Sequence, residues 1–176
     1  MNENGRIQFK TDWTHVIDWE KTVQSPDGLE TTDYVGYYNY DVLDTQGSAS
    51  LTWYKDQWRV RWSTKYKAAI TVDKDDKESW LDDMATNDEN CAAGNAECIS
   101  NPESLAFNEI GSYVKHSLSV SYTMDTGNGA EVRLSGGINN IFDNQGSFSL
   151  GGRGHFYSGY GSSVGRFAYF GAEVKF

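Results

Sequence analysis

The stretch GRFAYFGAEVKF, residues 165–176, carries apolar side chains at every second position. Because successive side chains of a β-strand project to opposite faces, this alternation predicts a strand with one face in an apolar medium and the other in a polar one. A protein core and a lipid bilayer both meet that requirement. The aromatic residue that ends the strand favours lipid, since aromatic girdles mark the interfaces of membrane barrels. The apolar set is Ala168, Phe170, Ala172, Val174 and Phe176, and the opposite set includes Glu173 and Lys175.

Five further segments alternate in the same way, over residues 6–20, 47–54, 58–68, 113–124 and 130–138. The clearest is 58–68, where large apolar side chains take one parity and basic or small polar side chains take the other. Its apolar members are Trp58, Val60, Trp62, Tyr66 and Ala68, and its polar members are Arg59, Arg61, Ser63, Lys65 and Lys67. With 165–176, these segments predict about six antiparallel strands.

The connections between these strands alternate between short and long. Residues 55–57 and 125–129 are tight turns, whereas 22–46, 73–111 and 144–164 are long. Transmembrane barrels have short periplasmic turns and long external loops. The sequence therefore predicts an all-β fold made of antiparallel transmembrane β-barrel strands, with the three long loops outside the cell and Phe176 on the periplasmic side.

Composition limits the function classes. The 176 residues are 38% hydrophobic and 14% aromatic with 18 glycines, which suits strands and turns and not helices. A net charge of −10 disfavours nucleic acid as a partner, because phosphate binding needs a basic face. The sequence contains no apolar run of about 18 residues, so it predicts no transmembrane helix. No catalytic or phosphate-binding motif is present, so we predict neither an enzyme nor a cofactor.

Two local features concern disulfide and metal chemistry. Cys91 and Cys98 lie in one short segment with glycine and asparagine between them, which favours a local disulfide over two free thiols. The acidic run 73–78 and the pair Asp82 and Asp83 lack the spacing of a calcium loop, so a solvated acidic loop is expected there. We predict no metal site.

Several motifs together resemble the C-terminal end of TonB-dependent outer-membrane receptors. They are Asn139-Asn140-Ile141-Phe142-Asp143, a Gly/Tyr-rich loop, Gly165-Arg166-Phe167, the terminal Phe176, and Gly111-Ser112-Tyr113 leading into 116–122. The resemblance implies that residues 1–176 are the C-terminal part of such a barrel, matching the last six of 22 strands. No plug domain, signal peptide or TonB box is visible in the sequence.

The same resemblance implies a function and a location. Such a receptor takes up a small nutrient, such as a siderophore or carbohydrate, across the outer membrane of a Gram-negative bacterium. Its partners are outer-membrane lipid, the barrel-assembly machinery, and the TonB system through the missing plug. Phe170, Val174 and Phe176 then belong to the signal that the assembly machinery reads.

Two groups of residues are candidates for ligand binding. The first group consists of lumen-facing cations, which are able to attract an anionic ligand or to pair with acidic lumen or plug groups. These are Arg59, Arg61, Lys65, Lys67 and Arg133. The second group consists of aromatic rings in the loops, which are able to stack on a ligand, with girdle or loop packing as the alternative. These are Tyr34, Tyr37, Tyr38, Tyr40, Trp80, Phe107, Phe156, Tyr157 and Tyr160.

Two other function classes stay open, a small outer-membrane β-barrel enzyme and a soluble β-rich binding module. Six strands also raise a physical difficulty, because unpaired edges in hydrocarbon cost several kcal/mol per unsatisfied backbone group. Missing strands, self-association or strands within the long loops would satisfy those edges. Residues 34–44 are the candidate for an additional strand.

Overall fold

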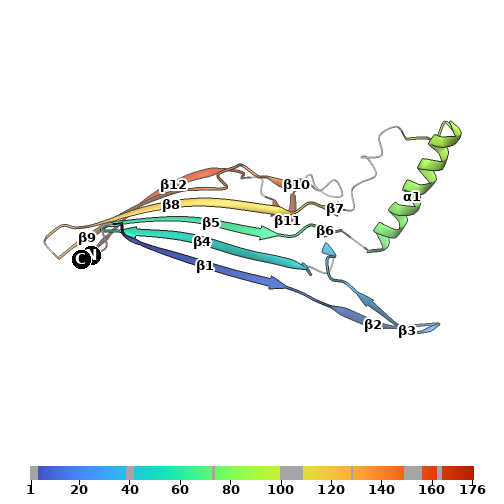
Figure 1. Ribbon diagram of the computed structural model, residues 1–176, viewed down its shortest axis with the longest axis horizontal. Coiled ribbons are helices and arrows are strands. Elements are labelled where there is room, and N and C mark those ends of the chain that lie inside the picture. The colour runs from blue at the N-terminus through green and yellow to red at the C-terminus, as the bar shows by residue number, and fades with distance from the viewer. Residues whose placement is uncertain are drawn as a thin grey trace.

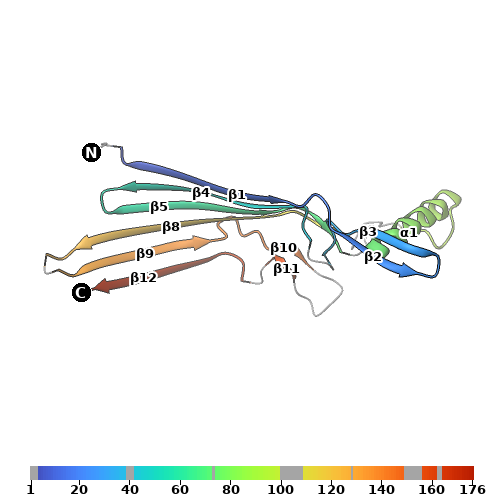
Figure 2. The ribbon, with the colours of Figure 1, turned by 90° about the horizontal axis from the view of Figure 1, so that it is seen from below.

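A single six-stranded sheet dominates the computed structural model, which describes residues 4–38, 42–72, 74–99, 109–127, 129–148, 156–161 and 164–176. Its spatial order is β1-β4-β5-β8-β9-β12, and every neighbouring pair is antiparallel (Figures 1 and 2). The strands are β1 (Arg6–His15), β4 (Thr45–Lys55), β5 (Trp58–Lys67), β8 (Tyr113–Asp125), β9 (Glu131–Asn139) and β12 (Phe167–Lys175). The predicted antiparallel architecture of six strands is confirmed. Within the described residues the sheet is open, with β1 and β12 as its edges.

The two tight turns lie at one end of the sheet, together with both chain termini (Figure 2). Asp56 adopts a left-handed φ of 50° between β4 and β5. Between β8 and β9, the Thr126 amide donates to the Ala130 carbonyl at 3.0 Å and the Gly127 amide donates to the Asp125 carboxylate at 2.8 Å. We call this end the short-turn end and the opposite one the loop end.

The three connections at the loop end are long, as predicted, and they contain regular structure. The first forms a hairpin of β2 (Glu20–Ser25) and β3 (Gly28–Asp33), the second contains β6 (Ile70–Thr71), α1 (Lys74–Ala93) and β7 (Glu109–Ile110), and the third contains β10 (Gly146–Phe148) and β11 (Phe156–Gly161). Residues 34–44 add no strand to the main sheet; Tyr37 and Val42 form an isolated bridge, and 39–41 lie outside the described residues.

Two predictions were wrong: the end of the first strand, and the loop expected at the acidic run. The first strand ends at His15 and not near Glu20, because its partner β4 begins at Thr45, opposite His15. The acidic run 74–78 and Asp82 and Asp83 belong to the helix α1, which Figure 1 shows beyond the loop end of the sheet. Within the described residues, no helix combines the length and apolar character needed to cross a bilayer.

A small hydrophobic core lies where the sheet meets the loop-end segments. Its buried members come from all three connections and from the first residue of β8: Leu43, Ile70, Ile110, Tyr113 and Tyr160. The Tyr160 hydroxyl donates to the Ala68 carbonyl at 2.9 Å, which ties β11 to the end of β5. These contacts hold the connections together at the loop end.

Candidate functional site

One face of the sheet is apolar across all six strands, and we call it the apolar face. The register aligns its side chains in cross-strand rows. One row is Ile7, Trp53, Val60, Val120, Gly136 and Phe170, and the next is Phe9, Leu51, Trp62, Leu118, Ile138 and Ala168. Since side chains two residues apart point to the same side, the rows lie on one surface.

The described part of the chain leaves this face uncovered. Ile7 is 67% exposed, Phe9 65% and Phe170 77%. Soluble monomers rarely expose contiguous apolar patches of more than a few hundred Å², so such a surface marks contact with a membrane or another protein. The hydrophobic core of the loop end shares no residue with the two rows above.

Aromatic pairs bound the apolar face at both ends. Near the short turns, the Trp58 and Tyr122 ring centroids are 4.7 Å apart. At the loop end, the Trp13 ring crosses over Gly47 and lies 5.8 Å from the Tyr66 ring. Trp58 and Tyr66 lie eight residues apart on β5, which is about 26 Å along a strand. That spacing resembles the outward apolar band of a membrane barrel, about 25 Å tall between its aromatic girdles.

A groove interrupts the apolar face between β8 and β12. Gly136 has no side chain in the row between Val120 and Phe170, which leaves a space of about 410 Å³. The lining includes Trp58, Leu118, Tyr122 and Leu134, so its walls are almost wholly apolar. Apolar walls of this kind favour contact with hydrocarbon over contact with polar groups.

The opposite, polar face brings together three of the five predicted lumen-facing cations. Arg59, Arg61 and Arg133 line a hollow of about 300 Å³ with Ser119, Ser121, Ser135, Tyr169 and Glu173. Lys65 and Lys67 lie outside it, further toward the loop end on β5. The Lys67 ammonium lies 5.2 Å from the centroid of the Tyr160 ring.

The predicted aromatic ligand contacts lie mainly against one another at the loop end. The Tyr34 ring is 5.9 Å from Trp19 and 6.4 Å from Tyr37, and Tyr38 is 5.2 Å from Tyr157. Tyr160 is 2% exposed within the hydrophobic core, so loop packing accounts for its position. Trp80 and Phe156 belong to α1 and β11, and their side chains lie outside the described part, as do Tyr40 and Phe107.

A hydrogen-bonded corner after β9 was missed as a structural site, although its residues were noted as a motif. Asn140 is 1% exposed and adopts a φ of 54°. Its side-chain nitrogen donates to the Asn144 backbone carbonyl at 2.8 Å, and its side-chain oxygen accepts from the Asn144 backbone amide at 3.1 Å. The Asn144 side chain donates to the Val114 carbonyl at 3.0 Å, and Asp143 accepts from the Arg166 amide at 2.7 Å. The corner thereby joins β8, β9 and the start of β12; asparagine in a turn was the available signal.

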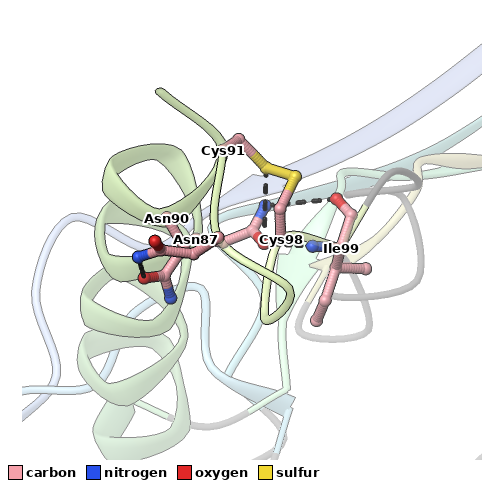
Figure 3. The surroundings of a disulfide bond; sticks show 6 residues. Asn87, Asn90, Cys91, Cys98 and Ile99 are labelled. Atoms are coloured by element: carbon pink, nitrogen blue, oxygen red, sulfur yellow. Dashed lines mark hydrogen bonds between the residues drawn. A yellow bond between two sulfur atoms is a disulfide. The ribbon is translucent and has the colours of Figure 1, made fainter. Parts of the chain in front are cut away.

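The predicted disulfide between Cys91 and Cys98 is present at the C-terminal end of α1 (Figure 3). The partly buried Asn87 side chain accepts from the Ile99 amide at 2.7 Å and donates to the Ile99 carbonyl at 3.3 Å. The disulfide and Asn87 thus fold the segment after the helix back against its last turns.

The predicted assembly-signal residues lie on one parity at the C-terminal edge. Phe170, Val174 and Phe176 are all exposed. Among the described residues, no group of three or more histidine, cysteine, aspartate or glutamate side chains is arranged to hold a metal ion. No family model, no curated protein and no solved structure matches this chain.

Proposed function

We propose that the sheet is part of the wall of an outer-membrane β-barrel, with the apolar face in lipid and the polar face toward the barrel interior. The observation that carries the proposal is the uncovered apolar face bounded by two aromatic pairs about 26 Å apart along β5. The short turns at one end and the structured connections at the other agree with periplasmic turns and external loops.

Lipid also fits the shape of this surface. A fluid acyl chain adapts to the groove beside Gly136, whereas a protein partner has to match it with fixed side chains. The edges β1 and β12 require pairing in hydrocarbon, since unpaired backbone groups there cost several kcal/mol each. Additional strands therefore complete the barrel.

Within this class, we propose the C-terminal wall of a TonB-dependent receptor that imports a small nutrient. The support is the set of motifs at the corner after β9 and at the start of β12. The corner gives a structural role to the motifs 139–143 and 165–167, because Asn140 and Asp143 hold the end of β9 to β8 and to the start of β12. Nutrient binding then involves the interior and the loop end.

Tryptophan quenching by brominated lipid tests the membrane part. In vesicles, a variant that keeps Trp62 alone should be quenched most by lipids brominated near the end of the acyl chain, because Trp62 lies midway between the aromatic pairs and so at the bilayer centre. A variant that keeps Trp58 alone should be quenched most by bromine near the headgroup. Trp19 lies between β1 and β2, beyond the sheet, and should respond to aqueous iodide only. Iodide quenching of Trp62 without lipid quenching would reject the membrane assignment and favour a soluble module.

Growth phenotypes test the receptor part. A strain that lacks the gene should fail to grow on one scarce nutrient, and a strain that lacks TonB should fail on the same nutrient. Iron-limited and carbohydrate-limited media supply the comparison, with a complemented strain as the control. Normal growth on that nutrient by the strain that lacks TonB would leave the protein in the barrel class but outside this receptor family.

A further inference from the structure

Arginines are concentrated on the polar face near the short turns. Four of the chain's six arginines lie there: Arg6, Arg59, Arg61 and Arg133. Arg6 and Arg59 flank Tyr54 in one cross-strand row, with guanidinium carbons 4.6 and 5.7 Å from the ring centroid. Lys65 and Lys115 lie nearer the loop end, whereas Lys175 lies at the short-turn end as the register partner of Glu131.

The hollow has cationic walls and a floor of small side chains. Arg59 and Arg61 stand on β5 and Arg133 stands on β9, with only β8 between these strands. Two strand spacings separate the walls by roughly 10 Å at the backbone. Ser119 and Ser121 on β8 occupy the space between, and their short side chains leave the hollow of about 300 Å³.

The charge of this lining favours an anion. Three guanidiniums and one carboxylate contribute to it. Glu173 is the cross-strand register partner of Arg133, so two guanidiniums remain in excess even if that pair is counted as neutral. Guanidinium groups bind carboxylates through two parallel hydrogen bonds, which lysine cannot do. The serine hydroxyls supply further donors at the floor.

We propose that this hollow is a carboxylate-binding site, reached from the short-turn end of the polar face. Its ligand is a carboxylate, carried either by a free small acid or by an acidic side chain of a polypeptide segment that lies against the polar face. The site is separate from the aromatic residues at the loop end. The inference concerns the polar face alone and does not depend on what covers the apolar face.

Calorimetry on the full chain in vesicles tests the site with two probes, succinate for the free acid and tetraglutamate for the polypeptide. Arg61→Gln and Arg133→Gln should each weaken binding by about tenfold, the effect of losing one charge-assisted contact. Arg61→Lys keeps the charge but loses the paired hydrogen bonds, so a smaller loss is expected. Lys65→Gln removes the same charge from the same strand outside the hollow, and it should change affinity by less than about twofold because of screening.

The outcomes separate the sources and the proposals. Binding of succinate alone assigns a free acid, binding of tetraglutamate alone assigns a polypeptide segment, and binding of both shows that the carboxylate itself is recognised. Circular dichroism of each variant checks that the sheet is retained. Absence of binding by both probes to the folded chain, or an equal loss in Lys65→Gln, would overturn the site. Tryptophan quenching on the same samples reports on the membrane assignment independently.

Discussion

Leu118→Arg is expected to reduce the folding free energy in lipid by about 2 to 4 kcal/mol, the cost of a cation at the bilayer midplane on a barrel's outer face. Leu118 pairs with Trp62 and Ile138 in the row midway between the two aromatic pairs. Denaturant titration of the chain folded into vesicles measures the change. Val114→Arg lies on the same face at the level of Tyr66, and there the cost should fall to about 0 to 1 kcal/mol.

The comparison of depths distinguishes lipid from the alternatives. Water on this face would make both substitutions nearly neutral, whereas a packed protein partner would penalise each according to its contacts and not according to its depth. Ser117→Arg, on the polar face next to Leu118, is the matched control and should be mild. Equal costs at positions 114 and 118 would contradict the membrane assignment.

Asn140→Ala is the second large effect that we expect, a loss of about 2 to 4 kcal/mol in the free energy of unfolding. The change removes both side-chain hydrogen bonds to Asn144 and leaves buried backbone groups unsatisfied, at about 1 to 3 kcal/mol for such a group. It also places a non-glycine residue without a local hydrogen bond at a φ of 54°. Denaturant unfolding of the reconstituted chain is the measurement.

Three variants separate these contributions. Asn140→Gly accommodates the left-handed backbone but not the hydrogen bonds, so it should recover only about 1 kcal/mol. Asn140→Asp keeps an acceptor for the Asn144 amide and loses the donor to the Asn144 carbonyl, so an intermediate loss is expected. Asn139→Ala changes the neighbouring residue within β9 and should have little effect. If Asn139→Ala were as damaging as Asn140→Ala, the corner would have no special role.

Period-two alternation was sufficient to predict the main sheet. The segment 58–68 matches β5, and 113–124 and 130–138 match β8 and β9 to within one residue. The parities were also right, because the register places Val60 beside Trp53 and Val120. Alternation is informative here because each strand separates an apolar surface from a polar one, so a slip of one residue would reverse every side chain.

The loop end was predicted poorly for identifiable reasons. The helix α1 is acidic and polar on all sides, so it lacks the apolar stripe by which an amphipathic helix is recognised. The hairpin β2–β3 has few apolar residues, and the turn at Pro26 and Asp27 was the available signal for it. Short β6, β7 and β10 depend on tertiary pairing that no local pattern records.

The candidate sites were predictable only in part. Parity placed Arg59, Arg61 and Arg133 on one face, but the hollow depends on which strands are neighbours and on the short serines between them. The buried corner was missed because asparagine is usually read as an exposed turn residue. Only the bonds between Asn140 and Asn144 show why a polar side chain is buried there.

In the proposed barrel, the opposite directions of the edge strands would restrict how the sheet is completed into a ring. Because β1 runs toward the loop end and β12 runs away from it, a fully antiparallel ring needs an even number of strands between them. If these additional strands form one continuous up-and-down segment with an even number of strands, that segment must begin and end on the same side, at the short-turn end. Any odd count would force one parallel seam, of the kind seen in the 19-stranded mitochondrial channel and not in bacterial single-chain barrels.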